Sequence, residues 1–309
     1  MDNKSITIVA PAYNHEKYIT KCLNSIANQN IEFMELIVID DVSRDNTRRI
    51  IEDILKNKGF VSKFKNGVSF IKHDKNMGAF YSLNEGLKCA KGEYLTMINT
   101  DDYYGDNHLS LLMEACERNG SEFAFGGVNI VDQNDNSVDS GYGKGIMKYQ
   151  SLIEKCPTVS MALSRGNSTI STGNMLFTRR LYDELQGFAN YKYVHDWDFA
   201  LRAALITEPV YVKEAQYIYR LHTGNTIAEI NQKNRNPDAL EKPINGQTIG
   251  INPLVMYFIN IIKGKYTNNK IPGIDVWEYF IYRKRYYDGD DSVIWAWNRA
   301  KYLVEDMQF

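Results

Sequence analysis

Pairs of adjacent aspartates follow two of the short apolar runs in this chain, and paired carboxylates at such positions suit the binding of a divalent cation. Asp40-Asp41 comes directly after the apolar run 36–39, and Asp101-Asp102 comes shortly after the run 94–98. Carboxylate oxygens are preferred ligands of Mg²⁺ and Mn²⁺, and the backbone N–H groups of a helix N-terminus bind phosphate oxygens. Because Asp is also a common turn former and helix cap, one pair alone would not indicate a site. Two pairs, with the polar segment 11–14 at the same edge, predict a site for a diphosphate and a cation.

The segments that carry these residues alternate between strand-like and helix-like patterns. The strand-like runs are 5–10, 36–39, 68–71 and 94–98, and apolar residues at helical spacing follow the first three. Four strand-like runs that alternate with helical patterns in the first 120 residues predict an α/β fold with a mostly parallel, Rossmann-like sheet flanked by helices. Ligands of such sheets bind outside the carboxyl ends of the strands, which is where 11–14, 40–41 and 99–102 are expected.

The composition excludes several classes of protein. The 309 residues include 36 Lys and Arg against 38 Asp and Glu, and this balance argues against a nucleic-acid partner. The four cysteines lie far apart without a CxxC pair, which favours buried thiols in a reducing compartment over disulfides or a zinc site. No apolar run reaches the roughly 18–20 residues that span a bilayer, and the N-terminus has no signal-peptide pattern. We therefore expect a cytoplasmic protein.

The second half of the chain is less regular. Strand-like segments are predicted at 122–131, 172–177, 210–212 and 217–219, with a Gly- and Asn-rich turn region that extends to Gly145. A helix is predicted to open at His195-Asp196-Trp197-Asp198. A stretch rich in Asn, Lys and Pro indicates a linker, and the apolar and aromatic segments beyond it predict helices.

The motifs, taken in order, resemble the family 2 glycosyltransferases, whose catalytic domain has the GT-A fold. The matching segments are 9–14, 36–47, 76–78 with 84–86, 92–95, 99–102, 195–198 and 220–222. The resemblance implies an inverting, metal-dependent transfer of a sugar from a nucleoside-diphosphate sugar to a hydroxyl acceptor, in polysaccharide or glycan biosynthesis. The resemblance spans about residues 5–225 and implies a GT-A nucleotide-sugar-binding and catalytic domain (1–225). Beyond it, composition predicts a linker (226–250) and a helical C-terminal extension (251–309).

The resemblance also implies residues for the donor nucleotide and the metal. The nucleotide-binding residues are Pro11, Ala12, Tyr13, Asn14, Asp40, Asp41, Asn76, Gly78, Asn99, Thr100 and Asp101. Tyr13 would stack on the base or else pack over its own loop, and an aspartate would accept the imide N–H of the base. The ligands of Mn²⁺ or Mg²⁺ are Asp101, Asp102 and His222, and which of the two aspartates is the main ligand stays open. A UDP-sugar is the favoured donor, and a glycan or lipid-linked molecule is the expected acceptor.

Asp196 matches the carboxylate that serves as general base in inverting members of the family. Displacement at the anomeric carbon needs a base opposite the leaving group to take the proton of the acceptor hydroxyl. The competing interpretation is that Asp196 only caps the helix that follows. The residues expected near the donor or acceptor sugar are Gly173, Asn174, His195, Trp197 and Arg220.

Three positions depart from the family pattern. Asn99 replaces the first Asp of the metal motif, Leu83 stands where many members have Arg, and His195 replaces a Glu. Asn99 and Leu83 support the alternative of a non-catalytic sugar-nucleotide-binding module. A nucleotidyltransferase is a further alternative, but it would need a Gly-rich phosphate loop, and segment 11–17 contains neither Gly nor Arg. The remaining histidines, His15, His73 and His108, are interpreted as structural or solvated.

The C-terminal extension places apolar faces beside basic clusters. The apolar run 254–262 precedes Lys263 and Lys265, and aromatic residues surround Arg283-Lys284-Arg285. Such a segment is suited to peripheral contact with the inner face of an anionic membrane, where lipid-linked acceptors reside. Packing on the catalytic domain or contact within a homodimer is the simpler interpretation.

Overall fold

The computed structural model describes residues 4–139, 141–156, 158–189 and 195–222, together with two short antiparallel strands, β9 (Lys270–Ile271) and β10 (Ile274–Asp275). The chain forms two compact units. The first comprises Met1–Gly145, Ile170–Gly187 and Val210–His222, and the second comprises Ile146–Thr169, Phe188–Pro209 and Thr223–Phe309. The expected linker and, apart from β9 and β10, the expected helical extension lie outside the described residues. The three-part division of the chain and the membrane or dimer contact of its tail therefore stay predictions.

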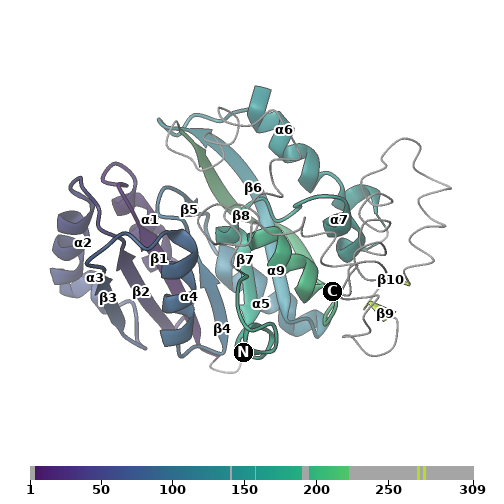
Figure 1. Ribbon diagram of the computed structural model, residues 1–309, viewed down its shortest axis with the longest axis horizontal. Coiled ribbons are helices and arrows are strands. Elements are labelled where there is room, and N and C mark those ends of the chain that lie inside the picture. Colours follow the sequence, from purple (N-terminus) through teal and green to yellow (C-terminus); the bar gives the residue numbers. More distant parts are fainter. Residues whose placement is uncertain are drawn as a thin grey trace, which may run out of the picture. The chain divides into compact units, whose positions relative to one another are not determined.

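One eight-stranded sheet organises the described part of the first unit, in the order β3-β2-β1-β4-β7-β6-β8-β5. Its strands are β1 (Ile6–Ala12), β2 (Met34–Asp40), β3 (Val68–Lys72), β4 (Tyr94–Met97), β5 (Tyr103–Tyr104), β6 (Phe123–Asp132), β7 (Met175–Thr178) and β8 (Val210–Leu221). The first four strands are parallel, with β1 between β2 and β4 (Figure 1). Because β7 runs antiparallel to β4 and β6, and β5 to β8, the sheet is mixed in its second half. The predicted α/β class is confirmed.

The described residues form helices, among them those predicted after the first three strands and at His195. They are α1 (Ile19–Ala27), α2 (Thr47–Lys56), α3 (Lys58–Val61), α4 (Ala79–Cys89), α5 (His108–Asn119), α6 (Gly141–Gln150), α7 (Val159–Arg165), α8 (Arg179–Glu184) and α9 (His195–Ala203), with 3₁₀ turns η1 (Ile153–Lys155) and η2 (Thr172–Asn174). The periodicity that predicted α1 corresponds to its buried face, which includes Ile19, Leu23 and Ile26. The expected turn region before Gly145 is different, because α6 already begins at Gly141.

Side-chain burial explains why the strands form. Every residue of β2 is buried, as a central strand covered on both faces requires. Helix α4 packs closely on β1 because Gly86 has no side chain, and a Cβ there would lie 2.4 Å from a methyl carbon of Val9. All four cysteines are free; Cys22 and Cys116 are buried as expected, whereas Cys89 is exposed and Cys156 is half-buried.

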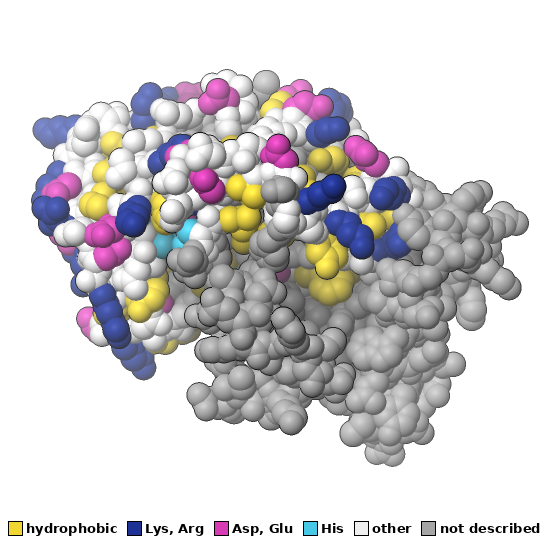
Figure 2. Space-filling model, turned by 90° about the horizontal axis from the view of Figure 1, so that it is seen from above, with side chains coloured by type: hydrophobic (Ala, Val, Ile, Leu, Met, Phe, Trp, Pro, Cys, Tyr) yellow, Lys and Arg dark blue, Asp and Glu magenta, His cyan; other side chains and the backbone are white. Residues whose placement is uncertain are grey.

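Two features of the described residues can be compared with the composition: the charges on the surface and the apolar character of the helices. Figure 2 shows both acidic and basic side chains on the described surface of this face. Within the described ranges, no helix combines the length and the apolar character needed to cross a bilayer.

His108 gives the fold a specific acid sensitivity. Its side chain is fully buried against Tyr104, with the two rings stacked at 4.7 Å, and burial lowers the pKa of His108 from 6.5 to about 3. Because the unfolded chain takes up this proton below pH 6.5 and the folded chain does not, stability is retained above pH 6.5 and falls as the pH drops toward 3. The limiting slope for one group is about 1.4 kcal/mol per pH unit.

We expect His108→Phe, which keeps an aromatic ring beside Tyr104, to show a smaller loss of stability between pH 6.5 and 4 than the wild type. Urea unfolding midpoints measured across this range test it. Parallel pH curves for the two proteins would show that His108 is not the group responsible.

Candidate functional site

The carboxyl ends of β2, β1 and β4 are adjacent, so the three polar segments singled out in the sequence meet at one edge of the sheet. Ala12 is paired with Asp40 in the parallel register, and the amide of Asp41 donates to the carbonyl of Ala12 at 2.9 Å. The hydroxyl of Thr100 donates to the carbonyl of Pro11 at 3.1 Å. The strand-end rule therefore located this edge correctly.

Asp101 faces two imidazoles at this edge. Its Oδ2 lies 3.0 Å from Nε2 of His222, which follows β8, and 3.9 Å from Nε2 of His15, which follows β1. Nδ1 of His15 lies 2.7 Å from the hydroxyl of Thr100. Burial raises the pKa of Asp101, but the hydrogen bond from His222 and the electrostatic interactions with His15 and His222 outweigh burial and hold this pKa below its usual value. The carboxylate is thus kept in the charged form that binds a cation.

This donor set fits a divalent cation. A carboxylate oxygen beside an imidazole nitrogen is suited to Mn²⁺, which accepts both oxygen and nitrogen ligands. No group of three His, Cys, Asp or Glu side chains within the described ranges is arranged to enclose a metal. A cation held by Asp101 and His222 would therefore need further oxygen ligands, and the phosphates of a nucleotide are such ligands. His15 was not singled out from the sequence, because its proximity depends on the packing of the loop after β1 on the loop after β4.

Asp102 has a different environment from Asp101. One of its oxygens accepts a hydrogen bond from the hydroxyl of Tyr217 at 2.5 Å, and the other accepts from the backbone N–H of Arg220 at 2.7 Å. The side chain is 2 % exposed, and burial together with the charge of Asp101 raises the pKa of Asp102 well above its usual value. These contacts hold β8 against the turn that carries Asp101, and the metal contact expected for Asp102 stays a prediction.

Arg220 and Gly173 support the same contact. The guanidinium of Arg220, which is 2 % exposed, donates to the carbonyl of Asp101 at 2.9 Å and to the carboxylate of Asp135 at 2.8 Å. A Cβ on Gly173 would lie 2.2 Å from the hydroxyl oxygen of Tyr217, so glycine makes room for the bond between Tyr217 and Asp102. The amide side chain of Asn174 is fully buried and pairs with the backbone of Gly126. The sugar contacts expected for Gly173, Asn174 and Arg220 stay predictions, and the observed contacts of all three lie within the fold.

Asp40 and Asp41 are both engaged by protein groups. Asp40 is fully buried, and its Oδ2 accepts from Nε of Arg48 at 2.7 Å, whereas its Oδ1 has no hydrogen-bond partner. The carboxylate of Asp41 accepts from the backbone N–H groups of Met77 and Gly78, both at 2.7 Å. It therefore satisfies N–H groups at the start of α4, within the segment 76–78 whose Asn76 and Gly78 were expected to bind the nucleotide.

The loop after β1 leaves Tyr13 accessible to a ligand. Its side chain is among the few large apolar side chains that are exposed, at 38 %. The loop is fixed on either side, because the amide of Asn14 donates to the hydroxyl of Ser43 and the side chain of Asn14 accepts from the amide of Arg44 at 2.7 Å. Asn14 adopts a left-handed conformation with φ of 59°, which Asn tolerates better than most residues. An exposed ring on a fixed loop is suited to stacking on a nucleobase.

In the second unit, Asp196 lies in the first turn of α9 and is held by two donors. Its Oδ1 accepts from the backbone N–H of Trp197, and its Oδ2 accepts from the side-chain amide of Asn167, both at 2.8 Å. The hydroxyl of Thr169 in turn donates to Oδ1 of Asn167 at 2.6 Å. Sequence analysis missed Asn167, because it lies in an irregular segment 29 residues away with no motif of its own.

The neighbours of Asp196 on α9 have structural contacts. Asp198 forms an ion pair with Arg202 one helical turn later, at 2.7 Å. The indole N–H of Trp197 donates to the carbonyl of Leu163 at 2.7 Å, and the ring of His195 lies edge-on to Phe188. Burial raises the pKa of Asp198 above its usual value, although the charge of Arg202 opposes this rise.

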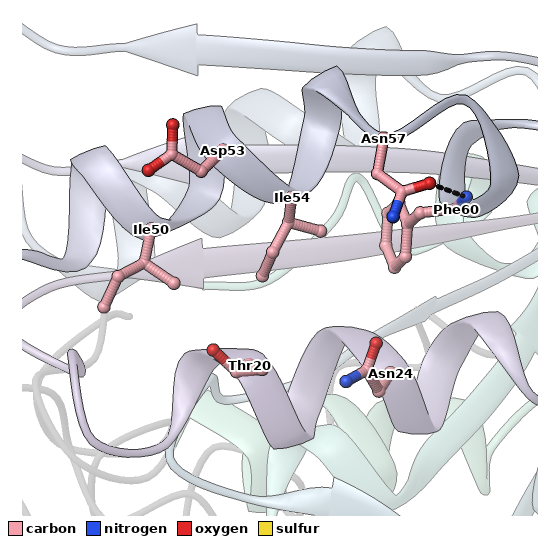
Figure 3. A pocket seen from close by; sticks show the side chains of 7 residues that line it. All are labelled: Thr20, Asn24, Ile50, Asp53, Ile54, Asn57 and Phe60. Atoms are coloured by element: carbon pink, nitrogen blue, oxygen red, sulfur yellow. Dashed lines mark hydrogen bonds between the residues drawn. The ribbon is translucent and has the colours of Figure 1, made fainter.

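A separate groove of about 420 Å³ lies between α1 and α2. Ile50 and Ile54 of α2 point toward Thr20 and Asn24 of α1 (Figure 3). None of the residues that line this groove was singled out from the sequence, and the titratable group among them, Asp53, is paired with Lys56.

Comparison with known proteins agrees with the motifs. The family model described as Glycosyl transferase family 2 matches residues 7–186. An uncharacterized glycosyltransferase of Haemophilus influenzae is 28 % identical over 232 residues, which cover 74 % of this chain and 69 % of that protein. The GalNAc(5)-diNAcBac-PP-undecaprenol beta-1,3-glucosyltransferase of Campylobacter jejuni is 24 % identical, with the same coverage of 74 % and 69 %. Glycosyltransferase GlyA of Streptococcus pneumoniae, 26 % identical, is longer, and the match spans 32 % of its length.

Two solved structures have a similar fold. The structure of S. aureus TarS 1–349 in complex with UDP-GlcNAc gives a TM-score of 0.60 at 19 % identity, and the match covers 96 % of this chain and 79 % of TarS. The mannosyltransferase PcManGT from Pyrobaculum calidifontis in complex with GDP-Man and Mn²⁺ also gives 0.60, at 15 % identity and with coverage of 96 % and 73 %. At these identities the likeness concerns the fold alone.

Proposed function

Because the chain belongs to glycosyl transferase family 2, we propose that it transfers a sugar, with inversion at the anomeric carbon and with a divalent cation, to a hydroxyl group of a glycan or lipid-linked acceptor. As a glycosyltransferase of this family it acts on nucleotide sugars. A UDP-sugar is the donor that we favour, since TarS, which shares the fold, has been solved with UDP-GlcNAc. The Campylobacter relative, whose name specifies an undecaprenol-linked acceptor, supports the lipid-linked alternative for the acceptor.

The observation that carries the proposal is the contact between Asp101 and His222. These residues are 121 positions apart in the chain, yet their side chains lie 3.0 Å apart at the nucleotide edge of the sheet. Both would hold the cation, which when bound offsets the negative charge that develops on the departing nucleoside diphosphate. The Mn²⁺ in the structure of PcManGT supports this choice of cofactor.

Other residues of this chain would position the donor and activate the acceptor. Tyr13 would stack on the base, and Asn99 and Thr100 would lie beside the ribose. Asp196 would accept the proton of the acceptor hydroxyl as that oxygen attacks the anomeric carbon. Asn167 and the amide of Trp197 orient the carboxylate of Asp196 and leave it lone pairs for this proton.

A donor screen tests the proposed function. We expect release of nucleoside diphosphate from a UDP-sugar, and less or none from GDP- or dTDP-sugars, with Mn²⁺ or Mg²⁺ present. EDTA should abolish the release, and added Mn²⁺ should restore it. The product from an α-linked donor should carry a β-linkage by NMR. Full activity in EDTA would contradict the requirement for a divalent cation. An α-linked product would contradict inversion at the anomeric carbon. If the protein bound none of the donors, the proposed function itself would be wrong.

A further inference from the structure

His73, which directly follows β3, lies between two carboxylates that come from different elements. Its Nδ1 is 2.7 Å from Oδ1 of Asp41 after β2, and its Nε2 is 2.7 Å from Oε2 of Glu85 on α4. The imidazole side chain is only 8 % exposed. Both ring nitrogens therefore contact acidic oxygens in a site with little access to water.

These two contacts determine the protonation state of the ring. An ionised carboxylate accepts hydrogen bonds only, whereas a neutral imidazole has one N–H and one lone pair. A neutral His73 would turn a lone pair toward one of the two carboxylates, so both contacts are favourable only for the imidazolium. Burial lowers the pKa of His73, but the hydrogen bonds to Asp41 and Glu85 outweigh burial and raise this pKa above its ordinary value.

The same aspartate that His73 contacts also fixes the segment before α4. Asp41 accepts from the amides of Met77 and Gly78, and the side chain of Asn76 donates to the carbonyl of Asp41 at 2.9 Å. Gly78 is the N-cap of α4 and has a φ of 85°, a conformation that glycine adopts at little cost. Segment 76–78 thus depends on Asp41 for its hydrogen bonds, and His73 connects Asp41 to the body of α4 through Glu85.

Other polar groups around His73 leave this arrangement intact. The guanidinium of Arg48 on α2, whose Nε is bound to Asp40, donates to the backbone carbonyl of His73 at 3.3 Å. The amide of His73 donates to the carbonyl of Asp40 at 3.0 Å. The ring of Tyr81 on α4 lies edge-on at 6.0 Å, and Asp74 and Lys75 follow on the same loop.

We propose that His73 is a positioning residue, an imidazolium that joins Asp41 to Glu85 and so holds segment 76–78 in the form that binds the donor nucleotide. Loss of its proton weakens nucleotide binding. The choice of a nucleotide as the ligand rests on the proposed function. The protonation of His73 and the order of segment 76–78 do not depend on that function.

Glu85→Gln tests the proposal, because the side-chain amide of Gln can donate to an unprotonated Nε2 while Nδ1–H still serves Asp41. In the wild type, binding of UDP with Mn²⁺ should weaken about tenfold between pH 6.5 and 9, the size expected for one hydrogen bond to a charged group. In Glu85→Gln the affinity should change much less over this range. Asp53→Asn is the matched control, because it removes one exposed carboxylate on α2 and should retain the pH dependence of the wild type. The comparison among the three proteins cancels the ionisation of UDP itself.

Two NMR measurements separate this proposal from the proposed function. The ring of His73 should titrate above pH 6.5 in the wild type and lower in Glu85→Gln. The amides of Met77 and Gly78 should lose protection from exchange at high pH in the wild type only. Ordinary titration of His73, or equal protection in both proteins, would overturn the proposal. Failure of UDP to bind at any pH would contradict the proposed function and the proposed effect of His73 on nucleotide binding. The two NMR measurements would still test whether His73 is protonated and whether its proton keeps segment 76–78 ordered.

Discussion

Asp196→Asn should reduce the rate of sugar transfer by a factor of about 10³ and leave the binding of the donor nucleotide within the range of the wild type. A positioned general base contributes roughly 10²–10⁴ to a rate, and an amide cannot accept the proton of the acceptor hydroxyl. The substitution is nearly isosteric, so the new side chain can still accept from the backbone N–H of Trp197. Steady-state transfer measured together with calorimetric binding of UDP separates the two effects.

Asp198→Asn is the matched control for this experiment. It makes the same change of charge two residues further along α9, where the carboxylate is buried and bonded to Arg202. Breaking a buried ion pair leaves the remaining charge without compensation, so the thermal midpoint should fall. Turnover per folded molecule should stay near that of the wild type. If Asp196→Asn kept full transfer activity, Asp196 would be a helix cap and no more.

Asp101→Asn should remove metal-dependent activity, with a loss of at least about 10², because a metal ion contributes several kcal/mol to stabilising charge in the transition state. An amide oxygen is a weaker ligand than a carboxylate and leaves His222 without its anionic neighbour. In the wild type, UDP with Mn²⁺ should raise the thermal midpoint, since a ligand that binds only the folded state stabilises it. In Asp101→Asn this rise should be absent, while the unliganded protein stays folded.

Asp102→Ala should give the opposite result. It removes the acceptor for the hydroxyl of Tyr217 and for the amide of Arg220, and a buried donor left without its partner costs about 1–3 kcal/mol. The thermal midpoint of the unliganded protein should therefore fall clearly. Under conditions where the variant is folded, Mn²⁺ and UDP should still raise the midpoint. If Mn²⁺ and UDP raised the thermal midpoint of Asp101→Asn but not that of Asp102→Ala, we would conclude that Asp102, and not Asp101, is the metal ligand.

The architecture of the nucleotide edge could be predicted from the sequence because it depends on local patterns. The run at 36–39 is apolar throughout, which predicts a strand covered on both faces, and β2 is buried at every position. Alternation of strands with helices then predicts parallel neighbours, whose carboxyl ends share one edge. These rules predict, without any knowledge of side-chain contacts, that three segments lie at that edge: 11–14, 40–41 and 99–102.

Irregular segments were predicted less well. A single strand, β8, replaces the two strands expected at 210–212 and 217–219. The pairing of β8 with β6 shifts its register between Gly126 and Gly127, and this shift accommodates the residues of β8 between Val212 and Gln216. Helix α6 begins inside a segment that its glycines had marked as a turn. Glycine has a low helix propensity, so a helix that contains several is not evident from sequence periodicity.

The sequence by itself thus determined the α/β class, the family motifs and the edge of the sheet at which the acidic residues gather. Only the tertiary structure decided which groups each carboxylate contacts there. Asp101 and Asp102 are adjacent and chemically identical, yet Asp101 faces His222 while Asp102 accepts from Tyr217, 115 residues away. His73, interpreted from the sequence as structural or solvated, lies between Asp41 and Glu85 in the same way. Strand and helix periodicity report which face of an element is buried, whereas the partner of a buried charge is set by the packing of distant segments.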